Sequence, residues 1–147
     1  MLILNGIIST NQQVEALGKN SLIQDITFAN SSGTVSVFTV TGDVLLRIIA
    51  VVTTDVVPDT TANIRLGVIG NTDAMMLDTV STTLDARYIW NDSSASREIE
   101  PADSIRSYII SDGNDVVLTL SAQVNSGVIR FYGFWTPLSA AGKVANA

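Results

Sequence analysis

The sequence predicts an all-β fold: an antiparallel β-sandwich, a jelly-roll-like fold or a small barrel of about eight to ten short strands. Three observations lead to this prediction. Segments rich in β-branched and aromatic residues recur along the chain, and clusters of Asn, Asp, Ser and Gly separate most of them. Only 15% of the 147 residues are charged, compared with roughly 25% in an average domain. Ser, Thr and Asn, which suit strands and turns, make up the difference.

The first half of the chain alternates between strand and turn signals. Residues 22–28 alternate weakly and stop at the turn formers 30–33. Residues 35–40 are rich in β-branched side chains, and Thr-Gly-Asp at 41–43 predicts a hairpin turn. Residues 44–53 are apolar on both faces except for Arg47, which predicts a strand covered on both sides.

The second half shows the same pattern. The remaining strands are expected at residues 62–69, 84–90, 97–100, 104–111, 116–121 and 128–136. Asp-Gly-Asn-Asp at 112–115 predicts a hairpin, and 125–127 predicts a further turn. Residues 72–77 are compatible with either a strand or a helical turn.

The length predicts a single β domain over residues 1–147. Residues 1–21 and 137–147 carry little strand signal and are expected to be arms or tails. The first residues lack the basic region of a signal peptide. The longest apolar stretch, residues 44–52, is too short to span a membrane, so no membrane partner is expected.

The composition excludes several chemistries. The chain has no His and no Cys, which rules out a Ser-His-Asp triad, a cysteine nucleophile and the commonest metal ligands. Its net charge is -6 and its eight basic residues are scattered, which argues against binding to nucleic acid. We therefore expect no enzyme, no cofactor and no metal site.

Four candidate sites fit structural roles better than catalytic ones. Glu98 and Glu100 would share one face of a strand, but charges of this kind commonly protect a strand edge. The oxygen-rich turn at 112–115 fits a hairpin better than a calcium site. Lys19 and Lys143 lie in the weakly structured ends, where a depressed pKa is not expected. The glycines of 67–70 lack the lysine of a phosphate loop.

The aromatic run at 131–135 carries large side chains on both faces of its strand. Phe131, Gly133 and Trp135 are expected on one face, with Tyr132 and Phe134 on the other. We expect the first face to fill the core. The second face would be covered either within the fold or by another protomer. Because this strand and residues 44–52 are both apolar on two sides, we predict a homotrimer.

Three stretches resemble a group of small virion structural proteins of tailed bacteriophages. They are GTVSVFTVTGDV at 33–44, LGVIGNT at 66–72 and GVIRFYGFWTPLS at 127–139. The resemblance implies a capsid decoration (cement) protein, or another accessory protein of the particle, with no active site. Such proteins are small β-rich modules, often trimers, seated where capsid subunits meet.

On this reading the partners are the major capsid protein and other copies of the chain, and the location is the capsid surface of a virion assembled in the bacterial host cytoplasm. The apolar residues of the ends and the second aromatic face are the candidate capsid or oligomer contacts: Leu2, Ile3, Leu4, Ile7, Ile8, Tyr132, Phe134 and Leu138. Val144 is a further apolar anchor in the C-terminal segment. The alternative is a tail-associated, lectin-like adsorption module that binds a bacterial surface glycan.

Overall fold

The computed structural model describes residues 20–92 and 94–147, and for residues 94–97 it describes the backbone alone. This part of the chain forms nine antiparallel strands and two short 3-10 turns. The strands are β1 (Asn20–Thr41), β2 (Val44–Pro58), β3 (Asn63–Val68), β4 (Asn71–Val80), β5 (Ile89–Asn91), β6 (Ser94–Arg97), β7 (Ser107–Ile110), β8 (Val116–Pro137) and β9 (Lys143–Asn146). The 3-10 turns are η1 (Ser81–Thr83) and η2 (Ala102–Ser104). The predicted all-β, antiparallel fold is confirmed.

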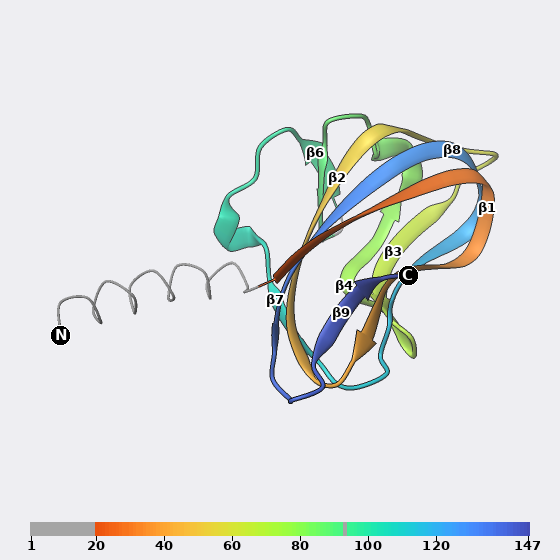
Figure 1. Ribbon diagram of the computed structural model, residues 1–147. Coiled ribbons are helices and arrows are strands. Elements are labelled where there is room, and N and C mark those ends of the chain that lie inside the picture. The colour runs from red at the N-terminus through yellow and green to blue at the C-terminus, as the bar shows by residue number, and fades with distance from the viewer. Residues whose placement is uncertain (1–19, 93) are drawn as a thin grey trace.

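The strands form one hydrogen-bonded sheet that folds over on itself into two layers (Figure 1). One layer contains the first half of β1, the second half of β8, and β2 with β5, β6 and β7 beyond it. The other contains β9, the second half of β1, the first half of β8, β3 and β4. Buried side chains from both layers meet in a single core cluster.

The strands β1 and β8 are longer than the sequence predicts. The expected strands 22–28 and 35–40 are one strand, and so are 116–121 and 128–136. The turn formers between them bend the strands instead of ending them. The β1–β8 register shifts between Ser31 and Gly33, and Gly33 and Gly127 both have positive φ. A bulge or bend of this kind lets strand pairing continue while the strand passes from one layer to the other.

The two predicted hairpins at 41–43 and 112–115 are wrong. β1 pairs with β8 and β9 but not with β2, and β7 pairs with β2 but not with β8. Both segments therefore connect the two layers. A turn dipeptide predicts a sharp reversal, but the choice of partner strand depends on the rest of the fold. A true two-residue hairpin joins β3 to β4, where Val68 pairs with Asn71 and Gly70 has φ +90°.

Other boundaries also differ from the prediction. Residues 72–77, for which strand and helical turn were both open, lie in β4. Within the expected strand 84–90, only the residues that belong to β5 form a strand. The residues before them form the loop that follows η1. The expected strand 97–100 is displaced to β6.

The end of the C-terminal segment is part of the domain instead of an arm or tail. Strand β9 pairs with β1 over Phe38–Thr41, and Val144 is buried in the core. The apolar character of Val144 therefore serves packing. Residues 1–19 of the other expected arm lie outside the described residues, and the last two residues of that segment, Asn20 and Ser21, begin β1.

Candidate functional site

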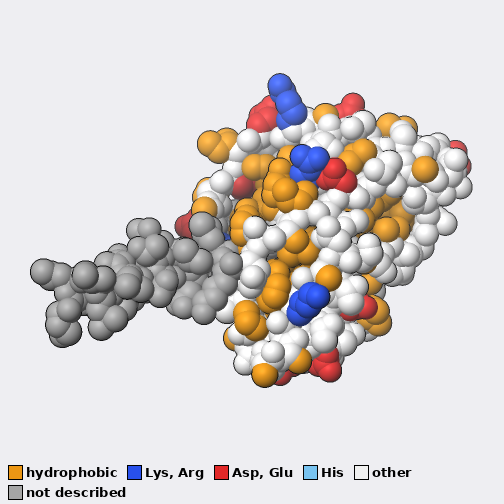
Figure 2. Space-filling view, in the orientation of Figure 1, with side chains coloured by type: hydrophobic (Ala, Val, Ile, Leu, Met, Phe, Trp, Pro, Cys, Tyr) orange, Lys and Arg blue, Asp and Glu red, His pale blue; other side chains and the backbone are white. Residues whose placement is uncertain are grey.

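Alternate side chains of three neighbouring strands point away from the core and form a broad apolar surface, which we call the outer face. It spans the first half of β1, β2 and the second half of β8, and it extends onto β5 and β7. Its main members are Ile23, Asp25, Leu45, Arg47, Ile49, Val51, Ile89, Ile109, Val128, Arg130, Tyr132 and Phe134. Figure 2 shows hydrophobic side chains gathered on this side of the molecule.

The strand register places the apolar members in rows. Tyr132 of β8 lies between Ile23 of β1 and Ile49 of β2. Ile23 is 52% exposed and Ile109, at the β7 margin, is 77% exposed. Large contiguous apolar patches are uncommon on monomers, and those that occur are commonly interaction surfaces.

The predicted alternation along the aromatic strand is confirmed. Phe131 is fully buried and contacts Trp90 edge to face, with ring centroids 6.4 Å apart. Gly133 is also buried, and Trp135 packs against the core. Tyr132 and Phe134 are half-buried on the outer face. The core face and the outer face thus follow from the two-residue period of a strand.

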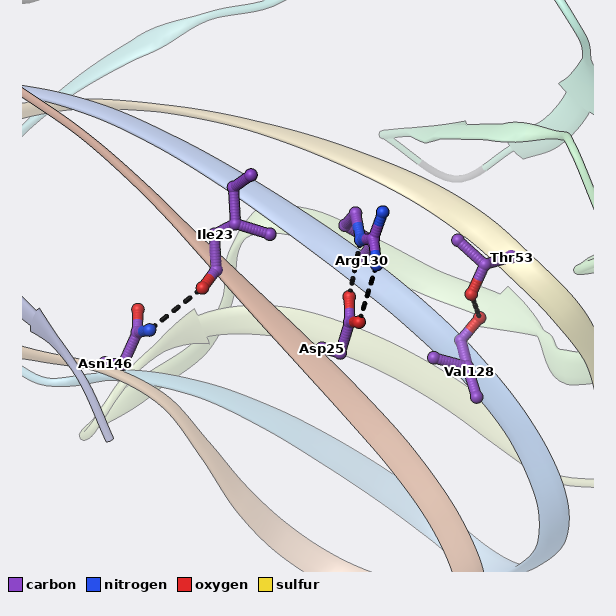
Figure 3. A network of polar contacts seen from close by, with 6 residues as sticks. All are labelled: Ile23, Asp25, Thr53, Val128, Arg130 and Asn146. Atoms are coloured by element: carbon purple, nitrogen blue, oxygen red, sulfur yellow. Dashed lines mark hydrogen bonds and ion pairs between the residues drawn. The ribbon is translucent and has the colours of Figure 1, made fainter.

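An ion pair crosses the outer face between β1 and β8 (Figure 3). The Arg130 guanidinium donates two hydrogen bonds to the Asp25 carboxylate, Nε to Oδ1 at 2.7 Å and Nη2 to Oδ2 at 2.8 Å. The hydrogen bond from Arg130 lowers the pKa of Asp25. The same bond, with a further one involving Tyr132, raises the pKa of Arg130. The pair is neutral as a unit, so it leaves no uncompensated charge among the apolar side chains.

Arg47, the one charge in the apolar stretch 44–52 of β2, has a structural role on the outer face. Its Nη2 donates to the carbonyls of Ile105 at 2.9 Å and of Ala102 at 3.1 Å. These bonds hold the segment around η2 beside the margin of the outer face.

The structure brings together only part of the predicted contact set. Tyr132 and Phe134 lie on the outer face. Leu138 lies beyond the end of β8, where it is 53% exposed and donates its N–H to the carbonyl of Asp43. The remaining predicted contacts, Leu2, Ile3, Leu4, Ile7 and Ile8, lie outside the described residues. Sequence reasoning missed Ile23, Ile49 and Ile109, although the alternation within each strand carried a weak signal for them.

A second feature lies where the two layers meet along β4 and β7. The Tyr108 hydroxyl donates to the Met75 carbonyl at 3.0 Å, and cavities of about 280 and 350 Å³ flank this contact. The larger cavity is mainly polar, lined by Met75, Asn91, Asp92, Asp103, Ser104, Arg106 and Tyr108. Burial raises the pKa of Tyr108.

The two acidic groups singled out from the sequence have other surroundings than a catalytic or metal site. Glu98 lies after β6, is exposed and forms an ion pair with exposed Arg87 at 3.9 Å, so Glu98 and Glu100 are not neighbours on a strand face. Asp112 and Asp115 accept hydrogen bonds from the backbone N–H groups of Gly42 and Val40. In the described part of the chain, no group of three or more Asp and Glu side chains is placed to hold a metal ion.

No protein-family model matches the chain, and no curated protein sequence matches it. Two solved structures are similar in outline. One is a chain in the acid-stable capsid structure of Helicobacter pylori bacteriophage KHP30, with 11% identity and a TM-score of 0.48; the match covers 86% of this chain and 94% of that one. The other comes from the disulfide-linked pili of Bacillus endospore appendages, with 13% identity and a TM-score of 0.36, over 82% of this chain and 87% of that one. At these scores neither likeness bears on function. Among the described residues, no helix is long and apolar enough to cross a membrane.

Proposed function

We propose that the chain is a non-enzymatic structural protein of a bacteriophage particle, a capsid decoration protein that binds the outer surface of the assembled head and stabilises it. The outer face carries this proposal, because it is a wide apolar surface whose two facing charges, Asp25 and Arg130, are paired with each other. The resemblance to small virion proteins supports it as well. Its third stretch, residues 127–139, contains Val128, Arg130, Tyr132 and Phe134 of the outer face.

The outer face has the properties of a protein-binding surface. A stable interface buries roughly 800 Å² per partner, and aromatic side chains near its centre carry much of the binding energy. Tyr132 and Phe134 lie on β8, the strand between β1 and β2, so they are well placed to act as such anchors. Because Asp25 and Arg130 already satisfy each other, covering the face leaves neither charge unpaired.

Residues 1–8 are proposed as a second point of attachment. Their apolar side chains would add contact area across a joint between capsid subunits. Several weak contacts on one assembly reinforce one another through a high effective concentration. Val144 of the C-terminal segment is not proposed as a point of attachment, because its side chain is buried in the core.

The test is binding of purified protein to heads that lack it, measured by co-sedimentation and by survival of the particles on heating. We expect Phe134→Asp to fold normally but to bind at least about tenfold more weakly, which corresponds to about 1.4 kcal/mol. Leu77→Asp is the matched control, since Leu77 is an exposed apolar residue on β4, in the other layer. Deletion of residues 1–8 is expected to spare folding and weaken binding. Normal binding by Phe134→Asp, or no protection of heads by the wild-type chain, would contradict the proposal.

A tail-associated, lectin-like adsorption module is the second candidate, and the polar cavity beside Tyr108 favours it. Arg106, Asp103 and Asn91 could hydrogen-bond sugar hydroxyls beside the Tyr108 ring. Under this function Arg106→Ala should abolish binding to a surface glycan, while Phe134→Asp should leave it intact. Recovery of the protein from tails alone would favour this second function over the first.

A further inference from the structure

Among the described residues, the first half of β1 is an open edge of the sheet. Residues 20–29 pair with β8 on one side, from Asn20 opposite Trp135 to Ala29 opposite Ser126. The other strand partner of β1 among the described residues, β9, pairs only with Phe38–Thr41. A hydrogen bond from Asn146 Nδ2 to the Ile23 carbonyl, 2.9 Å long, reaches this edge from β9 (Figure 3).

This hydrogen bond shows which backbone N–H and C=O groups of β1 point away from β8. The carbonyl of Ile23 points away from β8, and backbone groups in a strand alternate between its two sides. The N–H and C=O groups of Ser21, Asp25 and Thr27 therefore point outward as well. The carbonyl of Val128, opposite Thr27, accepts a bond from Thr53 of β2, as the same alternation requires.

This edge lacks the features that usually prevent strands from pairing between molecules. Open edges are commonly protected by lysine, proline, inward charges or short length. Residues 20–29 contain no Lys, Arg or Pro, and their one charge, Asp25, is neutralised by Arg130. By comparison, β4 carries the exposed carboxylates of Asp73 and Asp78, and β9 is four residues long with exposed Lys143.

We propose that this edge joins two copies of the chain, with β1 of one copy pairing antiparallel with β1 of the other about a two-fold axis. An edge that alternates donors and acceptors is matched by another extended backbone, and two identical edges can satisfy each other in this way. The chain as a whole has a net charge of -6, which opposes self-association, but the only carboxylate at this edge is compensated.

The pairing would also extend the outer face. Ile23 lies at the margin of that face, so the joint would bury it and place the outer faces of two copies side by side in one continuous sheet. The edge therefore favours a two-fold pair over the trimer that the sequence predicts. This inference does not rest on the proposed function, because it concerns only contacts between copies.

The test is the mass of the full-length protein in solution, measured by sedimentation equilibrium. We expect wild type to form a dimer. Thr27→Pro should remain folded, because the Thr27 N–H does not donate to β8, and it should raise the dimer dissociation constant by about tenfold or more. Thr27→Lys should do the same by placing a charge at the joint, which covers the case in which the proline variant fails to fold.

Thr53→Lys is the matched control. Its side chain lies on β2, away from the edge, and is exposed like that of Thr27. A dimer of Thr53→Lys together with a monomer of Thr27→Lys would support edge pairing. A wild-type monomer, a wild-type trimer, equal effects of the two lysine variants, or a folded Thr27→Pro variant that dimerises normally would each overturn it.

Discussion

Asp25 and Arg130 lie directly opposite each other on β1 and β8 and are joined by two hydrogen bonds of 2.7 and 2.8 Å. Their contact ties the edge strand of the layer to its neighbour. It also places a neutral ion pair among the apolar side chains of the outer face, where a lone charge would oppose the binding of any partner.

The ion pair predicts a pH dependence of stability. The pKa of Asp25 is lowered by the hydrogen bond from Arg130, so the stabilisation is present above the unfolded-state pKa of about 3.9 and is lost as pH falls through the lower folded-state value. Asp25→Asn should have a lower urea midpoint than wild type at neutral pH. The difference should shrink toward zero as the pH falls through the folded-state pKa of Asp25, and a difference that does not depend on pH would contradict this account.

The two faces of the aromatic strand predict opposite outcomes for two similar substitutions. Phe131 is fully buried, so Phe131→Asp places a charge in the core and should unfold the domain. Phe134 is half-buried on the outer face, and Phe134→Asp should keep a cooperative thermal transition. Circular dichroism melting distinguishes the two. If both variants unfolded, the outer face would be part of the packed interior.

A bend in β8 predicts a glycine requirement at position 127. Gly127 has φ +128°, and a Cβ there would lie 2.7 Å from the Val56 Cα and 2.8 Å from the Asp55 carbonyl oxygen. Gly127→Ala should lower the free energy of unfolding by at least about 1–3 kcal/mol. The strain of a positive φ and the collision of the new Cβ with the β2 backbone both contribute. Gly113→Ala is the control, since Gly113 also has positive φ but open space around it. Equal losses in the two variants would show that the close approach to β2 is unimportant.

The connections between the layers predict insensitivity to chelators. Asp115 Oδ1 accepts the Val40 N–H at 2.8 Å and Asp112 Oδ1 accepts the Gly42 N–H at 2.7 Å, so both carboxylates have protein partners. EDTA should leave the melting temperature unchanged, whereas Asp115→Ala should lower it by removing an acceptor for a part-buried N–H. A drop of several degrees with EDTA would reveal a stabilising metal ion.

The local pattern of the sequence predicts a large part of this fold. The β-branched segments identify most strands, and the turn formers locate nearly every sharp change of direction. Some failures concern the bounds of strands, as at β5, β6 and β9, and others concern the choice of partner strand. The segments at 41–43 and 112–115 look like hairpins, yet each carries the chain between layers. Their carboxylates and N–H groups bond to one another across the two connections, a contact between residues about 70 positions apart in sequence.

The sequence by itself determined the all-β class, the lack of histidine and cysteine chemistry, and the division of residues 131–135 between two faces. These properties depend on composition and on the two-residue period of a strand. Only the tertiary structure decided that Ile23, Tyr132 and Ile49 form one row and that β9 completes the second layer. It also decided that residues 20–29 form an open edge within the described part of the chain. The reason is that strand register and order depend on pairings between distant segments, which no local pattern specifies.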